Sequence, residues 1–377
     1  MVSKFPARCI SLKLNAALLE NYLEVVYKKQ VKVSRFNPLG KESEANAEKD
    51  LKGFGYGVPY VIDFKLEGKM KQVVFETMRS EGFGHDYFSD RAQILLWQHS
   101  FFNKLSRHVR SIDVGAFTMD GEPLRSLGEC REFFLLTEFV NGQLYHLDLD
   151  RLMETSELAE YDEKRCLALS DYLVEIHKLK KESPRLYVRR ARELVGHGEC
   201  IMGLLDSYPS QLDFVSESDL IAIERDCVVW RWSLKRRAHR LSQVHGDFHP
   251  WNILFREGTD FTVLDRSRGE LGEPADDVAA MTINYLFYSL QKNGELAGVF
   301  DRLFRLFWAN YLEKTDDWEI LEVVQPFYAW RGLVVASPMW YPALSKDVRV
   351  KLVNFVKHVL QFEEFDLNEV NSYIFDA

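Results

Sequence analysis

Hydrophobic and polar residues alternate along residues 31–36 (VKVSRF), which is the two-residue period of a half-buried β-strand. Two more strands are predicted at 60–66 and 71–78, and the turn residues Glu67-Gly68-Lys69 lie between them. Residues 15–29 have helical spacing instead, with Asn15 as the expected N-terminal cap. The face expected to be buried carries Leu18, Leu19, Tyr22, Val25 and Val26.

Helical patterns dominate the rest of the chain. Residues 90–105 predict a helix whose inward side chains are Ile94, Leu95, Trp97 and Phe101. A buried strand is expected at 133–136 (FFLL), and helices are expected from Gly142 onward, including 167–178, 183–240 and much of the chain after Met281. Strands followed by many helices favour an α+β fold, with an N-terminal lobe at 1–140 and a helical C-terminal lobe at 141–377.

One polar stretch interrupts the helices and carries the candidate chemistry. Residues 244–252 (VHGDFHPWN) form a loop, and 253–255, the turn at 257–259 and 261–264 predict a hairpin that ends on Asp265. The loop and hairpin are expected to bring the side chains of Asp247, Asn252 and Asp265 close together at one end of the hairpin. Their oxygen atoms suit a hard cation such as Mg²⁺ better than zinc or copper. Phosphoryl transfer needs such a set, whereas the alternative is an ordinary polar hairpin.

The motif HGDFHPWN followed by Val263-Leu264-Asp265 resembles the aminoglycoside phosphotransferase and choline kinase family. The resemblance implies a bilobal protein-kinase-like fold that uses ATP and Mg²⁺ to phosphorylate a hydroxyl of a small molecule. By position, it implies that Asp247 is the catalytic base and that Asn252 and Asp265 bind magnesium. His245 and Asp277 would support the loop, the latter from the start of a helix.

The nucleotide site implied by the resemblance lies earlier in the chain. A glycine-rich turn with Gly53, Gly55 and Gly57 would cover the phosphates with backbone amides, although such glycines also make simple turns or bulges. The segment 137–142 resembles the hinge between lobes, where the backbone of Glu138, Phe139 and Val140 would bind adenine. The alternative is a core strand that ends in an Asn-Gly turn.

The sequence departs from the family in the third strand. Residues 73–78 (VVFETM) lack the lysine that meets the α- and β-phosphates in the family. Arg79 or Lys71 could replace it, or both could be solvated edge charges. The gap leaves two alternatives open: a pseudokinase that binds nucleotide without transfer, and an enzyme that transfers a nucleotidyl group.

Composition narrows the class of protein. The 377 residues are 46% hydrophobic, enough for a sizeable core, and the net charge of −9 argues against nonspecific nucleic-acid binding. No apolar run is long enough for a membrane span, the N-terminus lacks a signal core, and the five cysteines are scattered, so a cytoplasmic protein is expected. The expected partner is a small-molecule acceptor, bound by a monomer or homodimer.

Two further features are ambiguous. Arg185, Arg189, Arg190 and Arg192 could bind an anionic acceptor, or they could form a solvated helix face. His177 closes the predicted helix at 167–178, and a buried structural histidine is expected there rather than a catalyst.

Overall fold

The computed structural model describes residues 15–38, 57–78, 84–103, 109–118, 123–128, 130, 137, 139–266 and 268–375. The chain forms two compact units, Met1–Thr137 and Glu138–Ala377. An antiparallel sheet in the first unit precedes a mostly helical second unit, so the predicted α+β fold class is confirmed. No described helix is long and apolar enough to cross a membrane.

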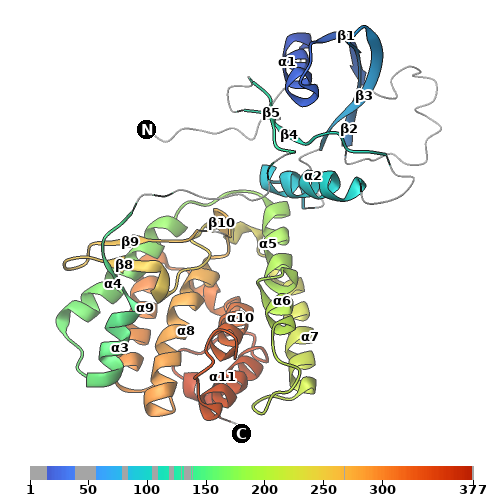
Figure 1. The fold of residues 1–377 in the computed structure, drawn as a ribbon. Coiled ribbons are helices and arrows are strands. Elements are labelled where there is room, and N and C mark those ends of the chain that lie inside the picture. The colour runs from blue at the N-terminus through green and yellow to red at the C-terminus, as the bar shows by residue number, and fades with distance from the viewer. Residues whose placement is uncertain are drawn as a thin grey trace. The chain divides into compact units, whose positions relative to one another are not determined.

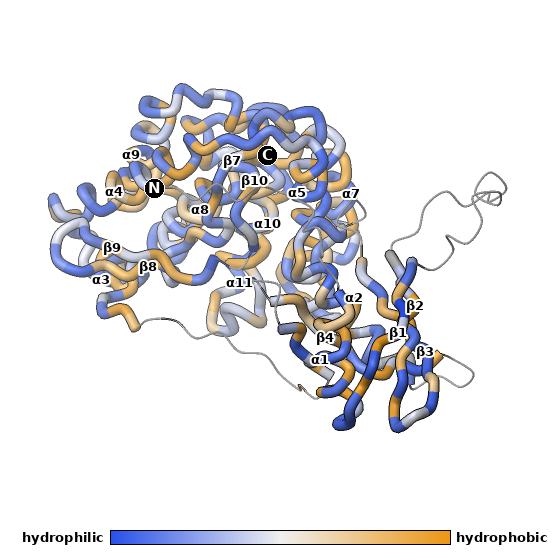
Figure 2. Tube along the Cα trace, turned by 90° about the horizontal axis from the view of Figure 1, so that it is seen from above, coloured by the Kyte–Doolittle hydropathy of each residue, from blue (hydrophilic) through white to orange (hydrophobic). Residues whose placement is uncertain are grey.

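The first unit is built on a three-stranded antiparallel sheet in the order β1-β2-β3 (Figure 1). Its strands are β1 (Val31–Pro38), β2 (Gly57–Leu66) and β3 (Lys69–Met78). Figure 2 shows hydrophilic and hydrophobic residues alternating along these strands. The β2–β3 hairpin turns at Glu67 and Gly68, whose φ angles of +48° and +80° match the positive values that a tight hairpin turn requires.

Helix α1 (Ala16–Tyr27) covers this sheet, and its start is the predicted one. The side chain of Asn15 accepts a hydrogen bond of 2.9 Å from the backbone N–H of Leu18. Two helix carboxylates, Glu20 and Glu24, accept hydrogen bonds from the backbone amides of β1 at Val33 and Val31. These contacts satisfy edge groups of the sheet that would otherwise be unpaired.

Two expectations in the first unit were wrong in detail. Val25 is exposed on α1, and Leu23 takes the buried place. Helix α2 (Phe88–Phe102) forms as predicted, but Trp97 is exposed on it rather than inward. The small strands β4 (Gly115–Ala116) and β5 (Arg125–Ser126) pair with each other.

Helix α8 (Pro274–Asn293) lies at the centre of the second unit and is buried on every side over most of its length (Figure 1). It packs against α9 and α10. The other helices of this unit are α3 (His146–Thr155), α4 (Glu160–His177), α5 (Pro184–Gly196), α6 (Ile201–Asp206), α7 (Glu217–Leu234), α9 (Gly298–Thr315), α10 (Gln325–Ala336) and α11 (Lys346–Val359).

Two small sheets complete the second unit. One joins β6 (Gln143–Leu144), β8 (Ile253–Phe255) and β9 (Phe261–Val263), and the other pairs β7 (Ser242–Gln243) with β10 (Leu271–Gly272). These sheets fix the polar loop between β7 and β8 at both ends. The lobe bounds 1–140 and 141–377 stay a prediction.

Candidate active site

The β8–β9 hairpin forms as predicted and sets the spacing of the candidate residues. Ile253 pairs with Val263, and the backbone N–H of Leu264 donates a 2.8 Å hydrogen bond to the carbonyl of Asn252. Asn252 and Asp265 therefore lie at the same end of the hairpin. Pro250 begins a short 3₁₀ turn that delivers Asn252 to this position.

Asp277 holds the loop before the hairpin through hydrogen bonds to its backbone. This residue is fully buried in the first turn of α8, and its two oxygens accept 2.7 Å hydrogen bonds from the backbone amides of His245 and Gly246. Gly246 has a φ of +85°, which favours glycine. Asp277 thus satisfies two adjacent amides of a tight turn that no secondary structure could pair.

His177 completes this buried network. Its Nε2 lies 3.1 Å from Asp277 Oδ2, and its Nδ1 lies 2.8 Å from the hydroxyl of Tyr311. Since a carboxylate only accepts, Nε2 carries a proton that it donates to Asp277. Burial alone would raise the pKa of Asp277, but the hydrogen bond and charge of His177 outweigh burial and lower it. His177 is buried inside the fold, which agrees with a structural role.

The Asp247 carboxylate has neighbours on both oxygens. Oδ1 accepts a 2.6 Å hydrogen bond from Nη1 of Arg331, and Oδ2 lies 3.3 Å from Nδ2 of Asn252 and 3.5 Å from Nε2 of His249. Burial favours a higher pKa for Asp247, but the hydrogen bond from His249 and the charge of Arg331 hold that pKa well below its usual range. Asp247 is consequently an ionised, firmly oriented carboxylate.

The side-chain oxygens of Asn252 and Asp265 are available to a ligand. Asn252 uses its amide N–H groups on Asp247, and its Oδ1 has no hydrogen bond within the described part of the chain. Asp265 is exposed and makes no hydrogen bond or ion pair with any described residue. Its φ of +52° is a strained conformation for a non-glycine residue, which is typical of functional positions. One amide and one carboxylate oxygen fit Mg²⁺, which takes few protein ligands when phosphates supply the rest.

Sequence reasoning missed Arg331 on α10. Its guanidinium is 6% exposed and joins Asp247 to Asp276, which it contacts at 2.6 Å, and it also donates to the carbonyl of Gly246 at 2.9 Å. Burial raises the pKa of Asp276 to about 6 even though Arg331 opposes the shift. The only feature of the local sequence that indicated a special role was a single arginine in the otherwise apolar segment 325–336, because its carboxylate partners lie far away in the sequence.

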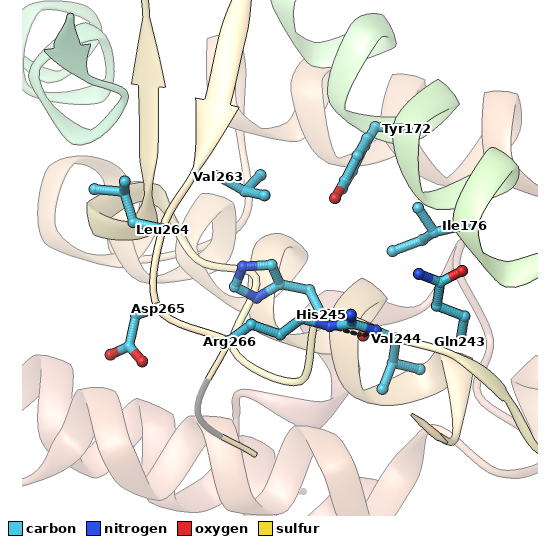
Figure 3. Close-up of a pocket in the computed structure, with 9 residues that line it drawn as sticks. All are labelled: Tyr172, Ile176, Gln243, Val244, His245, Val263, Leu264, Asp265 and Arg266. Carbon is cyan, nitrogen blue, oxygen red and sulfur yellow. Dashed lines mark hydrogen bonds between the residues drawn. The ribbon is translucent and has the colours of Figure 1, made fainter. Parts of the chain in front are cut away.

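Arg266, directly after Asp265, was missed as well. Its guanidinium donates to the carbonyls of Val244 and Glu270 and so ties the chain after Asp265 to the strand before the loop. Beside it lies a cavity of about 240 Å³ (Figure 3), lined by Tyr172, Ile176, Gln243, Val244, His245, Val263, Leu264, Asp265 and Arg266. Figure 3 shows the Asp265 carboxylate pointing away from His245, so the carboxylate lies apart from the histidine ring.

The nucleotide residues are only partly described. Gly53, Gly55, Arg79, Glu138 and the expected strand at 133–136 lie outside the described residues. Gly57 begins β2 opposite Met78, Phe139 is exposed and Val140 is partly exposed. Lys71 is exposed on β3, with its ammonium 5.4 Å from the ring centre of Tyr27. Their roles remain predictions.

The arginines of α5 are mostly engaged within the fold. Arg189 and Arg190 both form ion pairs with Glu193, at 2.6 and 2.7 Å, and Arg190 also donates to the carbonyl of Leu271. Arg185 and Arg192 are exposed. The cluster is therefore neither a uniformly solvated face nor a free anion-binding patch.

Comparison with known protein families finds that one family matches this chain. The phosphotransferase enzyme family matches residues 98–318, which is more than half of the chain. No curated protein matches the sequence.

Solved structures are similar at low identity. An amicoumacin kinase, hAmiN, in complex with AMP-PNP, Ca²⁺ and Ami is 15% identical with a TM-score of 0.41, over 83% of this chain and 89% of that one. The ADP-bound aminoglycoside phosphotransferase APH(2'')-Ib is 13% identical with a TM-score of 0.30, over 92% and 98%. A choline kinase from Cryptosporidium parvum Iowa II is 13% identical with a TM-score of 0.32, over 94% and 93%.

Proposed function

The chain belongs to the phosphotransferase enzyme family, and we propose that it transfers the γ-phosphoryl group of ATP to a hydroxyl of a small molecule. The observation that carries the proposal is the arrangement around Asp247. An ionised carboxylate is fixed beside Asn252 in a loop that Asp277 braces, and the free carboxylate of Asp265 lies at the same end of the hairpin as Asn252. A merely structural loop has no need for an unpaired carboxylate in a strained conformation.

Asp247 acts by orienting the acceptor. In the reaction, the acceptor oxygen bonds to the γ-phosphorus, the bond from that phosphorus to the β,γ-bridging oxygen breaks, and ADP leaves. The hydroxyl proton passes to Asp247 and then to solvent. Because the pKa of Asp247 is low, the carboxylate is a weak base, and its main contribution is to align the hydroxyl through a hydrogen bond. Phosphoryl transfer through a loose transition state needs little proton abstraction from the base, so alignment of the hydroxyl is sufficient.

Asn252 Oδ1 and the Asp265 carboxylate would hold Mg²⁺, which neutralises charge on the phosphates when bound. Asn252 would then have two functions, because its N–H groups donate to Asp247 while its oxygen would bind the metal. This division couples the position of the base to that of the metal. Loss of Asn252 is expected to disturb both.

For the nucleotide, we carry forward the residues implied by the family resemblance. The backbone at Gly53, Gly55 and Gly57 would cover the phosphates, and the backbone of Glu138, Phe139 and Val140 would bind adenine. Arg79 would replace the missing lysine of the third strand. If β3 continues past Met78, alternation puts Arg79 on the face of Phe75 and Thr77.

Mass analysis of products separates this function from its alternatives. The protein is incubated with ATP, Mg²⁺ and a metabolite pool, with Asp247→Asn as the matched control. A product heavier by one phosphoryl group, formed only by the wild type, supports the proposal. A product heavier by a nucleotidyl group indicates nucleotidyl transfer instead. ATP binding without any product, across varied acceptor pools, favours the pseudokinase.

A further inference from the structure

Arg268 follows the candidate metal ligand Asp265 by three positions, in a stretch of chain that is fixed on both sides. Before it, the Arg266 guanidinium donates three hydrogen bonds to backbone carbonyls. After it, the carbonyl of Leu271 accepts a 2.8 Å hydrogen bond from Nε of Arg190 on α5. The backbone at Arg268 therefore has a defined position.

The Arg268 side chain lies against the loop that carries Asp247. Its Cβ is 3.2 Å from the position that a Cβ would take at Gly246, the residue before Asp247. Its guanidinium carbon is 4.7 Å from the ring centre of Trp330. The guanidinium carbon of Arg331, which donates to Asp247, is 3.8 Å from the same ring. Arg268 thus presents a second cation close to the candidate base, on an indole that the two arginines share.

The two arginines differ in how fully their charge is balanced. Arg331 contacts the carboxylates of Asp247 and Asp276, each at 2.6 Å. Asp276 is near enough to feel the charge of Arg268, but its hydrogen bonds come from Arg331. Among the described residues, the carboxylate that contacts Arg268 is Glu199, at 3.3 Å, and its side chain is 66% exposed whereas that of Arg268 is 22% exposed. An ion pair with so exposed a partner contributes little and is easily displaced.

The other neighbours of Arg268 do not balance its charge either. The Cys200 sulfur lies 3.7 Å from Nη1 of Arg268, but burial raises the pKa of this thiol to about 12, so the thiol is uncharged. Nε of Arg268 and Nε1 of Trp330 are both buried, and neither has a hydrogen-bond partner in the described part of the chain. Buried N–H groups without an acceptor are rare in folded proteins. Two of them beside a poorly balanced guanidinium indicate a place for a ligand with negatively charged oxygen atoms.

We propose that Arg268, stacked on Trp330, binds a carboxylate or phosphate group of the acceptor, so that the acceptor is a hydroxylated anion. This inference rests on the proposed function, because it assigns the chemical class of the molecule that is phosphorylated. A guanidinium offers two parallel N–H groups to either kind of anion. Glu199 pairs with Arg268 until the anionic group displaces it.

Binding can be followed through the indole N–H resonance of Trp330 in NMR spectra, which is assigned by its loss in Trp330→Phe. The probes are glycerol, glycerate, glycerol 3-phosphate and inorganic phosphate, added with AMP-PNP and Mg²⁺ present so that they cannot enter the nucleotide site. Glycerate and glycerol 3-phosphate should shift the resonance saturably, whereas glycerol should not. They should also bind at least about tenfold more tightly than inorganic phosphate, because their hydroxyl adds a hydrogen bond to the Asp247 carboxylate.

Two variants should change this binding in opposite directions. Arg268→Gln should weaken the binding of both hydroxylated anions at least about tenfold, since it removes a charged, forked contact. Glu199→Gln should tighten it by up to about fivefold, because it removes the competing carboxylate. An arginine that only covers Trp330 would not produce these opposite signs. Arg305→Gln is the matched control, since Arg305 is exposed and pairs with Asp301 within α9, and it should leave binding unchanged.

The proposal is overturned if no anionic probe shifts the resonance, if Arg268→Gln binds the probes as wild type does, or if inorganic phosphate binds as tightly as the hydroxylated anions. It is also overturned if AMP-PNP with Mg²⁺ alone shifts the resonance and excludes the probes, since Arg268 would then bind the nucleotide. Because binding is read without turnover, lack of a phosphorylated product counts against phosphoryl transfer, whereas lack of a shift counts against the anion subsite.

Discussion

Replacing Arg331 with methionine tests whether this residue positions Asp247. The guanidinium is 6% exposed, and it lies between Asp247 and Asp276, whose side chains are each 16% exposed. Removing one partner of a buried ion pair costs about 3–5 kcal/mol, because it leaves uncompensated charge. The partial exposure of both carboxylates favours the lower end, about 3 kcal/mol. In a unit of this size, such a loss lowers Tm by about 6–12 °C.

Activity should fall by more than stability explains. Without Arg331, Asp247 loses its 2.6 Å hydrogen bond on Oδ1, and a displacement of about 1 Å at a catalytic group reduces turnover about 100-fold. The ATP KM should change little, since Arg331 touches the loop and not the proposed nucleotide residues. Arg331→Lys keeps the charge but cannot form the forked contact, so it should recover part of the stability and little of the turnover.

Adding Asp276→Asn to Arg331→Met separates the effect of Arg331 on stability from its effect on turnover. In the double variant with Arg331→Met, one of the two stranded carboxylates is gone, so Tm should rise relative to Arg331→Met alone. Turnover should stay low, because Asp247 still lacks its anchor. Steady-state kinetics and thermal unfolding measure both quantities. The reasoning is refuted if the double variant regains turnover along with Tm, because Arg331 would then act through stability alone.

Three further predictions follow from the same geometry. Since burial raises the pKa of Asp276 to about 6 when folded, against about 3.9 when unfolded, the stability of the wild type should fall by up to about 3 kcal/mol as pH rises from about 4 to above 6. Asp276→Asn, which stays neutral, should lack this part of the fall in denaturant titrations at several pH values, and an equal fall in both proteins would contradict the assignment. Asp265→Asn should weaken ATP binding in calorimetry only when Mg²⁺ is present, and an unchanged metal dependence contradicts its role as ligand. Arg79→Ala should raise the ATP KM about tenfold or more while Lys71→Ala does not, and equal effects would mean that the phosphates are held otherwise.

The sequence by itself determined the local elements. The Asn15 cap, the turn at Glu67 and Gly68 and the β8–β9 hairpin each depend on residues within a few positions of one another. Cap side chains, positive-φ turns and two-residue alternation act over that same range, so the printed order of residues is sufficient to predict them. The hairpin then fixes Asn252 and Asp265 at one end.

Only the tertiary structure decided which distant residues meet. Arg331 lies 84 positions beyond Asp247, and no period or spacing in α10 indicates that its one charged side chain faces the loop. The same limit explains Val25, Trp97 and the arginines of α5. Apolar residues occur on more than one face of these helices, and the neighbouring elements that cover a face are set by long-range packing. Which faces are buried, and which charges are paired, is therefore decided when the elements of each unit pack together.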